Sequence, residues 1–449
     1  MRAIAIFAIL SAVAPCLSAD DPPRAMYRAD MADEIDAMIA RGISGWIDYY
    51  KDLHAHPELS EHERESARKI ADHLTRAGYS VTSGIGGHGL VGVLVNGKGP
   101  TVLIRGDMDA LPVMEETGLP YASEVRVPRP DGSTVGVMHA CGHDIHQTCL
   151  VGTAQLLAAM RDRWRGTALI LAQPAEEIGK GARLMIESGI FDRINRPDFC
   201  LALHVSAGDP AGTVAYTPGW ALANVDSVDI RIFGRGGHGS RPHETVDPVV
   251  AAAQIIVSLQ TIVSRRVDPL ESAVITVGSI HAGSKHNIIS DEAVLQLTVR
   301  SYSDETRRVL LDGIRDVTLH TCRAMGCEKD PIVYVREDEF TPSTYNDLEL
   351  AAAAAEVFRQ AIGAERVRVR APVMGGEDFG RYPRHLGVPG LIFWLGSVSS
   401  ATYEASLEPG ADPLPSLHSN KFAPDPKPTI ETGVKCMTSL ALALFDTVE

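Results

Sequence analysis

The residues best suited to chemistry lie in a short run from His139 to Asp144, which reads His-Ala-Cys-Gly-His-Asp. Cys141 and His143 are separated by one glycine, at the start of a helix predicted over 144–163. Both side chains can then face one metal site, and a bound cation would keep the thiol deprotonated. An ordinary loop with a buried cysteine is the alternative, and this run alone does not separate the two.

A second candidate site is the pair Glu176 and Glu177, which closely follows a strand predicted over 167–172. Carboxylates at the carboxyl end of an interior strand face the cleft in which open α/β sheets bind ligands. Adjacent carboxylates can divide the work, because one can bind metal while the other takes a proton from the attacking water. Paired glutamates are more often a solvated helix start, so the motif alone leaves that alternative open.

Two histidines extend this candidate site. His204 ends a predicted strand, and His418 lies in a polar loop before the last predicted helix. A lone histidine is more often a structural group, but His143, Glu177 and His204 all lie at strand ends or helix starts on one rim. Thiolate, imidazole and carboxylate ligands together suit zinc, manganese, cobalt or nickel better than magnesium or calcium. Five protein ligands exceed the four of a structural zinc site, so we expect two divalent ions, with zinc or manganese preferred.

Strands and helices alternate in the segments that would position these residues. A capping box of Ser60 and Glu63 predicts a helix from Ser60 to Tyr79. Strands are expected at 90–95, 101–105, 167–172, 199–204, 366–370 and 390–395, and further helices at 144–163, 180–188, 348–362 and 429–445. This alternation predicts an α/β fold with a largely parallel sheet covered on both faces.

The pattern changes at residue 221. The expected order is strand 227–233, helix 248–264, strands 273–280 and 293–300, helix 304–324 and strand 332–335. This βαββαβ order is the ferredoxin-like arrangement, which can close a small core of its own. We therefore predict a lid domain over 221–338, inserted between catalytic parts at 31–220 and 339–449.

Composition limits the partners and the compartment. Of the 449 residues 45% are apolar and 22% charged, and the net charge of −15 offers no basic surface for nucleic acid.

The N-terminus predicts a cleaved signal over 1–19, because Arg2 is followed by an apolar stretch to Leu17 and by small residues at Ser18 and Ala19. We therefore expect an exported protein, periplasmic or secreted. An uncleaved anchor is the alternative, although the stretch is shorter than the ~20 residues of a membrane span. No other segment is long and apolar enough to span a bilayer, so we expect no stable span in the mature form.

Cysteine spacing does not resemble a disulfide scaffold. Six cysteines remain beyond Cys16 of the signal, spread over a long chain. Cys322 and Cys327, on a predicted helix and its exit, are the candidate pair, and free buried cysteines are the alternative.

Several motifs, in order from Ile43 onward, resemble the M20 family of metallo-amidohydrolases, in the branch of hippurate hydrolases, N-acyl-amino-acid deacylases and auxin-conjugate hydrolases. They are His56-Pro57-Glu58-Leu59, Arg105 to Pro112, the Cys141 run, the glutamate pair, Gly236-Gly237-His238, Gly375 to Phe379 and Leu417-His418. The resemblance implies a three-layer αβα zinc-exopeptidase-like catalytic domain with a lid that often forms homodimers.

The resemblance also implies roles at the metal site. Cys141 would bridge two ions, and Glu176 would activate the water. The remaining ligands of the two ions would be His143, Glu177, His204 and His418. Asp107 and Asp109 would orient the ligands, although a role in the turn after the strand fits them equally.

Away from the metal site, the resemblance implies substrate contacts. His238 in the lid would help to polarise the scissile carbonyl, across a dimer interface in one arrangement, and a surface histidine is the alternative. Asn287 and Arg300 would hold the substrate carboxylate, with Gly375 and Gly376 beside the substrate. Ser290 stands where the family pattern has proline, and the loops 126–134 and 397–416 look longer than typical.

The expected function is metal-dependent hydrolysis of N-acyl amino acids or short peptides, which are small-molecule substrates. One alternative is a dipeptidase or carboxypeptidase of the same chemistry. Another is a catalytically silent exported binding protein, against which the intact Glu176 argues, because a pure binder needs no general base.

Overall fold

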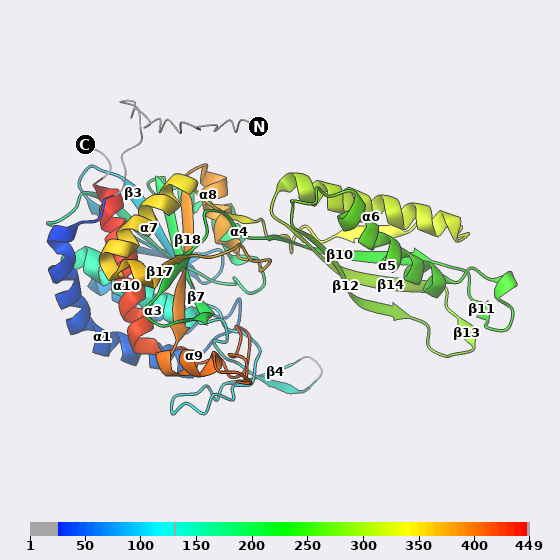
Figure 1. Cartoon of the computed structure of the whole chain (residues 1–449), viewed down its shortest axis with the longest axis horizontal. Coiled ribbons are helices and arrows are strands. Elements are labelled where there is room, and N and C mark those ends of the chain that lie inside the picture. Colours follow the sequence, from blue (N-terminus) through cyan, green and yellow to red (C-terminus); the bar gives the residue numbers. More distant parts are fainter. Residues whose placement is uncertain (1–25, 130–131, 447–449) are drawn as a thin grey trace, which may run out of the picture.

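The computed structural model describes residues 26–129 and 132–446 of the chain. An α/β domain forms one end of the molecule, and an elongated lid projects from its side (Figure 1). The predicted signal and its cleavage site lie outside the described residues.

One mixed sheet forms the centre of the α/β domain. Its strands are β1 (Ser80–Ile85), β2 (Gly89–Asn96), β3 (Thr101–Asp107), β6 (Gly166–Gln173), β7 (Phe199–Pro210), β8 (Val214–Tyr216), β17 (Val367–Val369) and β18 (Gly390–Val398). They lie in the order β1-β2-β6-β3-β7-β18-β8-β17. The central strands β6, β3, β7 and β18 are parallel, whereas β1 and β6 pair antiparallel with β2, and β8 pairs antiparallel with β18. The prediction of a largely parallel sheet is confirmed; the exceptions are β2, which forms an antiparallel hairpin with β1 through a short turn, and β8, which is antiparallel to β18 and parallel to the edge strand β17.

Helices cover both faces of this sheet and make three layers (Figure 1). One face carries α1 (Ala32–Ala55), α2 (Arg64–Arg76), α3 (His143–Ala159), α7 (Leu348–Ile362) and α10 (Pro426–Phe445), and the other carries α4 (Gly181–Glu187) and α8 (Arg381–Leu386). Along β3, Val102 and Ile104 pack into the first layer and Leu103 into the second. Because both faces are buried, the strand is apolar without alternation.

The start of α2 differs from its prediction. The helix begins at Arg64, and the Glu58 carboxylate accepts hydrogen bonds from the backbone N–H groups of Glu65 and Ser66 at 3.0 and 2.8 Å. The predicted capping box is therefore wrong. Ser60 instead donates to Asp109 Oδ2 at 2.6 Å, which ties this loop to the end of β3.

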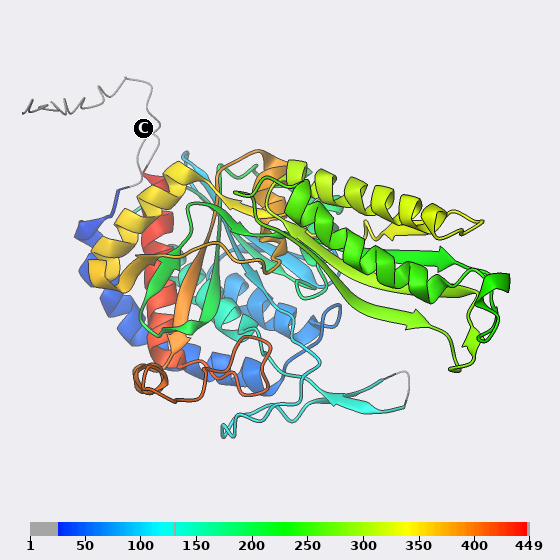
Figure 2. The same ribbon diagram turned by 45° about the vertical axis from the view of Figure 1, so that its right-hand side comes forward.

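The lid has a sheet and core of its own. Its elements are β10 (Asn224–Phe233), α5 (Pro248–Arg265), β12 (Ala273–Ala282), β14 (Glu292–Ser301), α6 (Asp304–Ala324) and β15 (Ile332–Val335). The strand order β12-β14-β10-β15 is antiparallel throughout, and α5 and α6 lie side by side over one face (Figure 2). The βαββαβ prediction is confirmed.

Capping side chains begin both lid helices. Asp247 precedes Pro248 at the first position of α5 and accepts from Val249 N, and Ser303 accepts from Thr306 N at the start of α6. Within the described ranges α5 is the one helix long and apolar enough to cross a membrane, and a third of it is buried, on the side that packs against the lid sheet.

Short elements complete the fold. They are η1 (Ala29–Met31), β4 (Arg126–Pro128), β5 (Thr134–Gly136), η2 (Ile190–Asp192), β9 (Gly219–Leu222), β11 (Gly237–His238), η3 (Pro242–Glu244), β13 (Ile288–Ile289), β16 (Thr344–Asn346), η4 (Ala364–Arg366), η5 (Asp378–Gly380) and α9 (Ser400–Ser406). The loop predicted at 397–416 thus contains a helix, which Ser399 caps by accepting from Thr402 N.

Candidate active site

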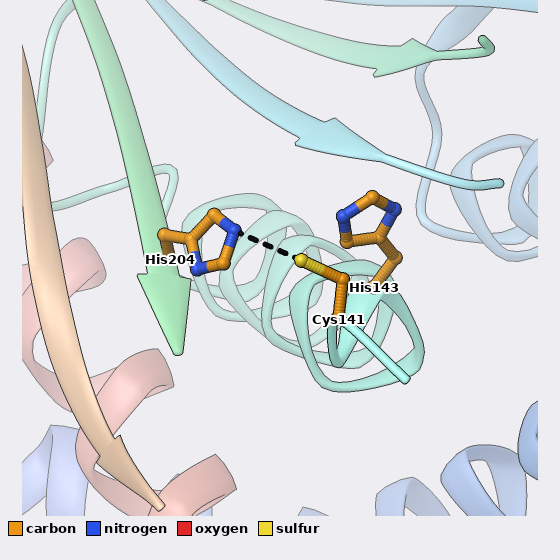
Figure 3. A group of neighbouring side chains, drawn as sticks. All are labelled: Cys141, His143 and His204. Carbon is orange, nitrogen blue, oxygen red and sulfur yellow. Dashed lines mark hydrogen bonds between the residues drawn. The ribbon is translucent and has the colours of Figure 1, made fainter. Parts of the chain in front are cut away.

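The five predicted metal ligands meet at the carboxyl ends of the central strands. Cys141 lies in the turn before α3, and its Sγ lies between two histidine rings, 3.5 Å from His204 Nε2 and 3.3 Å from His418 Nε2. Figure 3 shows Cys141 and His143 at the start of α3 facing His204 on β7. Side chains from distant segments thus surround one thiol.

Glu177 joins the cluster from the turn after β6. Its Oε2 lies 3.6 Å from His418 Nε2, and its Oε1 lies 3.8 Å from His143 Nε2. The donor atoms form two tight triplets, Cys141 with His143 and His204, and Cys141 with Glu177 and His418. The thiol is shared by both triplets, which is the arrangement that two neighbouring ions need.

The chemistry of these donor atoms fits divalent metal ions. Both ring nitrogens of His143 and Oε1 of Glu177 are buried without a hydrogen-bond partner among the described residues. Burying such groups unpaired is costly, and the cost is recovered if they coordinate a cation. Burial lowers the pKa of His204 well below its ordinary value, which keeps this imidazole neutral and able to bind metal.

The backbone is strained where it presents these side chains. Ala175 and His418 have φ of +52° and +68°, in the left-handed region that non-glycine residues rarely occupy. Gly142 has φ +77°, and a Cβ there would lie 2.5 Å from Val205 Cγ2. Glycine at 142 therefore allows the turn that separates Cys141 from His143. Strain of this kind persists where surrounding contacts hold it, often at functional sites.

Asp107 and Asp109 lie directly behind the ligands. Asp109 Oδ2 accepts from Glu177 N at 2.9 Å, while its Oδ1 lies 3.3 Å from His143 Nδ1 without hydrogen-bond alignment. Asp107 Oδ1 lies 2.6 Å from Nδ1 of His146.

Sequence reasoning missed His146. Its Nε2 accepts from Val205 N at 2.9 Å, so that it links α3 to β7 beside His204. The available signal was its spacing, because a residue three positions after His143 shares its helix face.

Glu176 lies beside the cluster with different neighbours. Its carboxylate lies within 4.8 Å of ligand atoms of two pairs of residues, His143 with Glu177 and Glu377 with Asp378. No hydrogen bond to this carboxylate occurs within the described ranges. Burial, followed by the charges of Glu377, Glu177 and Asp378, raises its pKa well above the ordinary value.

A buried arginine organises the acidic groups near Glu176. Arg105 lies 2.7 Å from Asp107, 2.8 Å from Glu377 and 3.2 Å from Asp378, and it donates to Gln173 at 2.9 Å. All these groups are buried. Sequence reasoning placed Arg105 and Glu377 in motifs but assigned them no role.

The lid does not bring its predicted residues to this cluster. His238 on β11 is exposed and pairs with Ile288 on β13, at the far end of the lid (Figure 1). Asn287 lies beside it, because Gly239 N donates to Asn287 O at 2.9 Å. The histidine accepts from Ser240 N at 3.1 Å through Nδ1.

The remaining predicted substrate residues lie where the lid joins the α/β domain. Arg300 donates to Met374 O at 2.7 Å. Ala223 N donates to Gly375 O at 3.0 Å, and a Cβ on Gly376 would lie 2.7 Å from Val225 Cγ2. Gly376 therefore lets the loop pass close to the connection into the lid, whereas a Cβ on Gly375 would come no closer than 3.9 Å to its neighbours.

Comparison with known proteins agrees with this geometry. Residues 103–417 match peptidase family M20/M25/M40. The chain is 37% identical over 364 residues to thermostable carboxypeptidase 1 of Saccharolobus solfataricus, covering 80% of this chain and 87% of the relative. It is 37% identical over 330 residues to hippurate hydrolase of Campylobacter jejuni, covering 73% and 82%.

A solved structure supports the same assignment. The YxeP protein of Bacillus subtilis, described as a dinuclear metal-binding peptidase of the M20 family, is similar with a TM-score of 0.72 and 30% identity, over 92% of this chain and 99% of that one. The likeness extends through both the α/β domain and the lid. The chain is therefore a metal-dependent hydrolase of amide bonds and belongs to peptidase family M20/M25/M40.

Proposed function

We propose that the protein hydrolyses the amide bond of N-acyl amino acids, with Glu176 as general base beside a two-metal site. The proposed ligands are Cys141, His143, Glu177, His204 and His418. One observation carries the assignment of the base: Glu176 borders the ligand cluster, yet within the described chain no hydrogen bond ties up its carboxylate. The resemblance to hippurate hydrolase, whose name denotes an N-acyl amino acid substrate, supports the substrate class.

The protein's own groups account for the proton transfers. Divalent ions at the cluster would polarise the amide carbonyl and acidify the attacking water. Glu176 takes the proton from that water and holds it until the amine is ready to leave. It then gives the proton to the amine nitrogen as the C–N bond breaks. Asp109 keeps Glu177 in place through its backbone N–H.

The lid would complete the site from a second copy of the chain. His238 lies on β11, at the end of the lid far from the α/β domain, so it reaches an active site only if the lid rotates or if it comes from a partner chain (Figure 1). Strand β12 is an edge strand of the lid sheet, and Val250 and Val257 on α5 are 50% and 65% exposed. An open strand edge with apolar neighbours favours pairing with another copy. Light scattering after size exclusion should give twice the monomer mass.

Substrate assays separate this proposal from its nearest alternative. A dipeptidase or carboxypeptidase of the same chemistry is favoured by the resemblance to thermostable carboxypeptidase 1. We expect turnover of N-acetyl and N-benzoyl amino acids by the metal-loaded enzyme, with free dipeptides and N-blocked dipeptides tested in parallel. Faster turnover of either peptide class would replace the proposed substrate. Hydrolysis of none of them by metal-loaded protein would contradict the assignment.

A further inference from the structure

Two cysteines meet at the end of helix α6 in the lid. The helix ends in a Schellman motif, because Cys327 N donates to Cys322 O at 2.9 Å and Gly326 N donates to Arg323 O at 3.1 Å. Gly326 has φ +80°, the left-handed conformation that this ending requires. Cys322 and Cys327 occupy the two positions of the motif whose side chains characteristically touch. Both pack against the core of the lid, so the fold itself makes the thiols neighbours.

The two thiols differ in access to solvent. Cys322 is 1% exposed, whereas Cys327 is partly exposed. Burial, with the adjacent thiol of Cys327, raises the pKa of Cys322 to about 12. Burial also raises the pKa of Cys327, but a hydrogen bond from Cys322 opposes that rise. Cys327 is therefore the thiol that a reagent from solvent reaches first.

The turn after Cys327 supports the segment that carries His238. Glu328 forms an ion pair with Arg235, and Lys329 Nζ lies 3.7 Å from the centroid of the Phe233 ring. Arg235 is followed directly by Gly236, Gly237 and His238. A more rigid turn would therefore restrain residues 233–240, which we call the lid tip.

We propose that Cys322 and Cys327 form a redox pair that closes into an intrachain disulfide and so stiffens the turn beneath the His238 segment. The oxidant is a small-molecule or protein disulfide. The thiolate of Cys327 attacks one sulfur of that disulfide, and the other sulfur leaves as a thiol. Cys322 then loses its proton, attacks Sγ of Cys327 and releases the second thiol. Two protein thiols thus give up two protons and two electrons, and the oxidant becomes two thiols.

Peptide mapping of the full chain tests the bond. The protein is treated with oxidised or reduced glutathione, blocked with iodoacetamide under denaturing conditions and digested with trypsin. Cleavage after Arg315, Arg323 and Lys329 places the two cysteines on separate peptides, 316–323 and 324–329. We expect these peptides to be disulfide-linked after oxidation and separately alkylated after reduction.

Two variants test which cysteine reacts first with the oxidant. Cys327→Ser should abolish the linked peptides, while Cys322→Ser should retain glutathione on Cys327, because the resolving thiol is missing. If oxidised wild-type protein yields both peptides alkylated, or glutathione on Cys327 without the link, the proposal is overturned.

Hydrogen exchange tests the effect on the lid tip. Oxidation should slow amide exchange in residues 324–336 and 233–240 of the wild type and leave the Cys327→Ser variant unchanged. Equal exchange in the oxidised and reduced wild type would refute the stiffening.

Discussion

At the scale of single residues, two adjacent glutamates stand in different surroundings. Glu177 faces His418 and His143, whereas Glu176 also borders Glu377 and Asp378. A carboxylate among imidazoles and a thiolate is suited to bind metal. Burial, with the nearby carboxylates, raises the pKa of Glu176, and burial also raises the pKa of Glu177 to about 7, so the two glutamates differ in their neighbours and not in the direction of the pKa shift. With Glu177 placed to bind metal, Glu176 is left to accept the proton.

Substituting each glutamate separately should reveal this division. Glu176→Gln should retain bound metal but lower kcat at least ~10²-fold, because an amide cannot take the proton from water. Glu177→Gln should lower metal content, since it removes a ligand. Metal analysis and kcat measured on the same preparations check both. Near wild-type turnover of Glu176→Gln would show that another group is the base.

His54, outside the metal site, adds a pH-dependent contribution to stability. Burial alone would lower its pKa, but hydrogen bonds to Asp144 at 2.7 Å and Glu115 at 3.1 Å outweigh burial and raise it to about 9. The folded protein binds this proton more tightly than the unfolded chain, in which the pKa is 6.5. Protonation of His54 therefore adds roughly 3 kcal/mol to the free energy of unfolding. This stability is complete below about pH 6.5 and is lost as the pH rises through about 9.

The variant His54→Gln should therefore lower Tm more at pH 6 than at pH 10. Thermal unfolding of wild type and variant at the two pH values measures the difference. His56→Gln is the matched control, because the His56 side chain is 66% exposed. A Tm gap for His54→Gln that does not narrow with rising pH would contradict the charged state of this histidine.

At the scale of elements, the turn between β6 and α4 presents both glutamates. Ala175 adopts positive φ, its N–H donates to Glu63 at 2.7 Å, and its carbonyl accepts from Gly181 N at 3.0 Å. The first residue of α4 thus packs against the residues before Glu176. The position of α4 therefore affects the conformation of the turn that carries both glutamates.

Gly181→Ala should disrupt this turn. A Cβ at position 181 would lie 1.6 Å from Pro174 O, so the backbone before Glu176 must move. We expect destabilisation of roughly 3 kcal/mol or more and a lower kcat. Gly208→Ala is the control, because a Cβ there meets nothing within 4 Å. Tm and kcat of the two variants, compared side by side, should differ clearly; equal values would refute the tight packing.

At the scale of the whole molecule, few strong contacts hold the lid in its orientation. Arg384 on α8 pairs with Asp304 at the start of α6, but both side chains are about half exposed. Such a pair contributes about 0–1 kcal/mol. Arg300 adds one hydrogen bond to Met374. Backbone hydrogen bonds at the connection, from Ala223 N to Gly375 O at 3.0 Å and from Val225 N to Thr341 O at 2.8 Å, add to these contacts at the base of the lid.

Removing metal should destabilise the α/β domain. Ions that bind only the folded state add about 2.7 kcal/mol at a hundred times Kd. A chelator should therefore lower the Tm of the wild type, and adding back zinc or manganese should restore it. Cys141→Ser, which lacks the shared thiol, should respond much less. If a chelator removed the metal without lowering the Tm of the wild type, the ions would not be stabilising the domain.

Local patterns and residue chemistry determined much of this protein in advance. The apolar periodicity of the lid predicted its βαββαβ order, and alternating strands and helices predicted the α/β domain. Cys141, His143 and Glu177 are recognisable in the sequence because thiolate, imidazole and carboxylate groups bind metals at any position in a chain. These features depend on residue type and on neighbours a few positions away, so they can be read without knowing the fold.

Only the tertiary structure decided which distant groups meet. Arg105 and Glu377 are 272 positions apart, and no local pattern indicates their ion pair. Glu58, not Ser60, caps α2, because the loop before the helix folds back on it. The distance of His238 from the cluster depends on the orientation of the lid. Long-range contacts, strand direction at the sheet edges and domain orientation are set by packing of the whole chain, which local sequence does not specify.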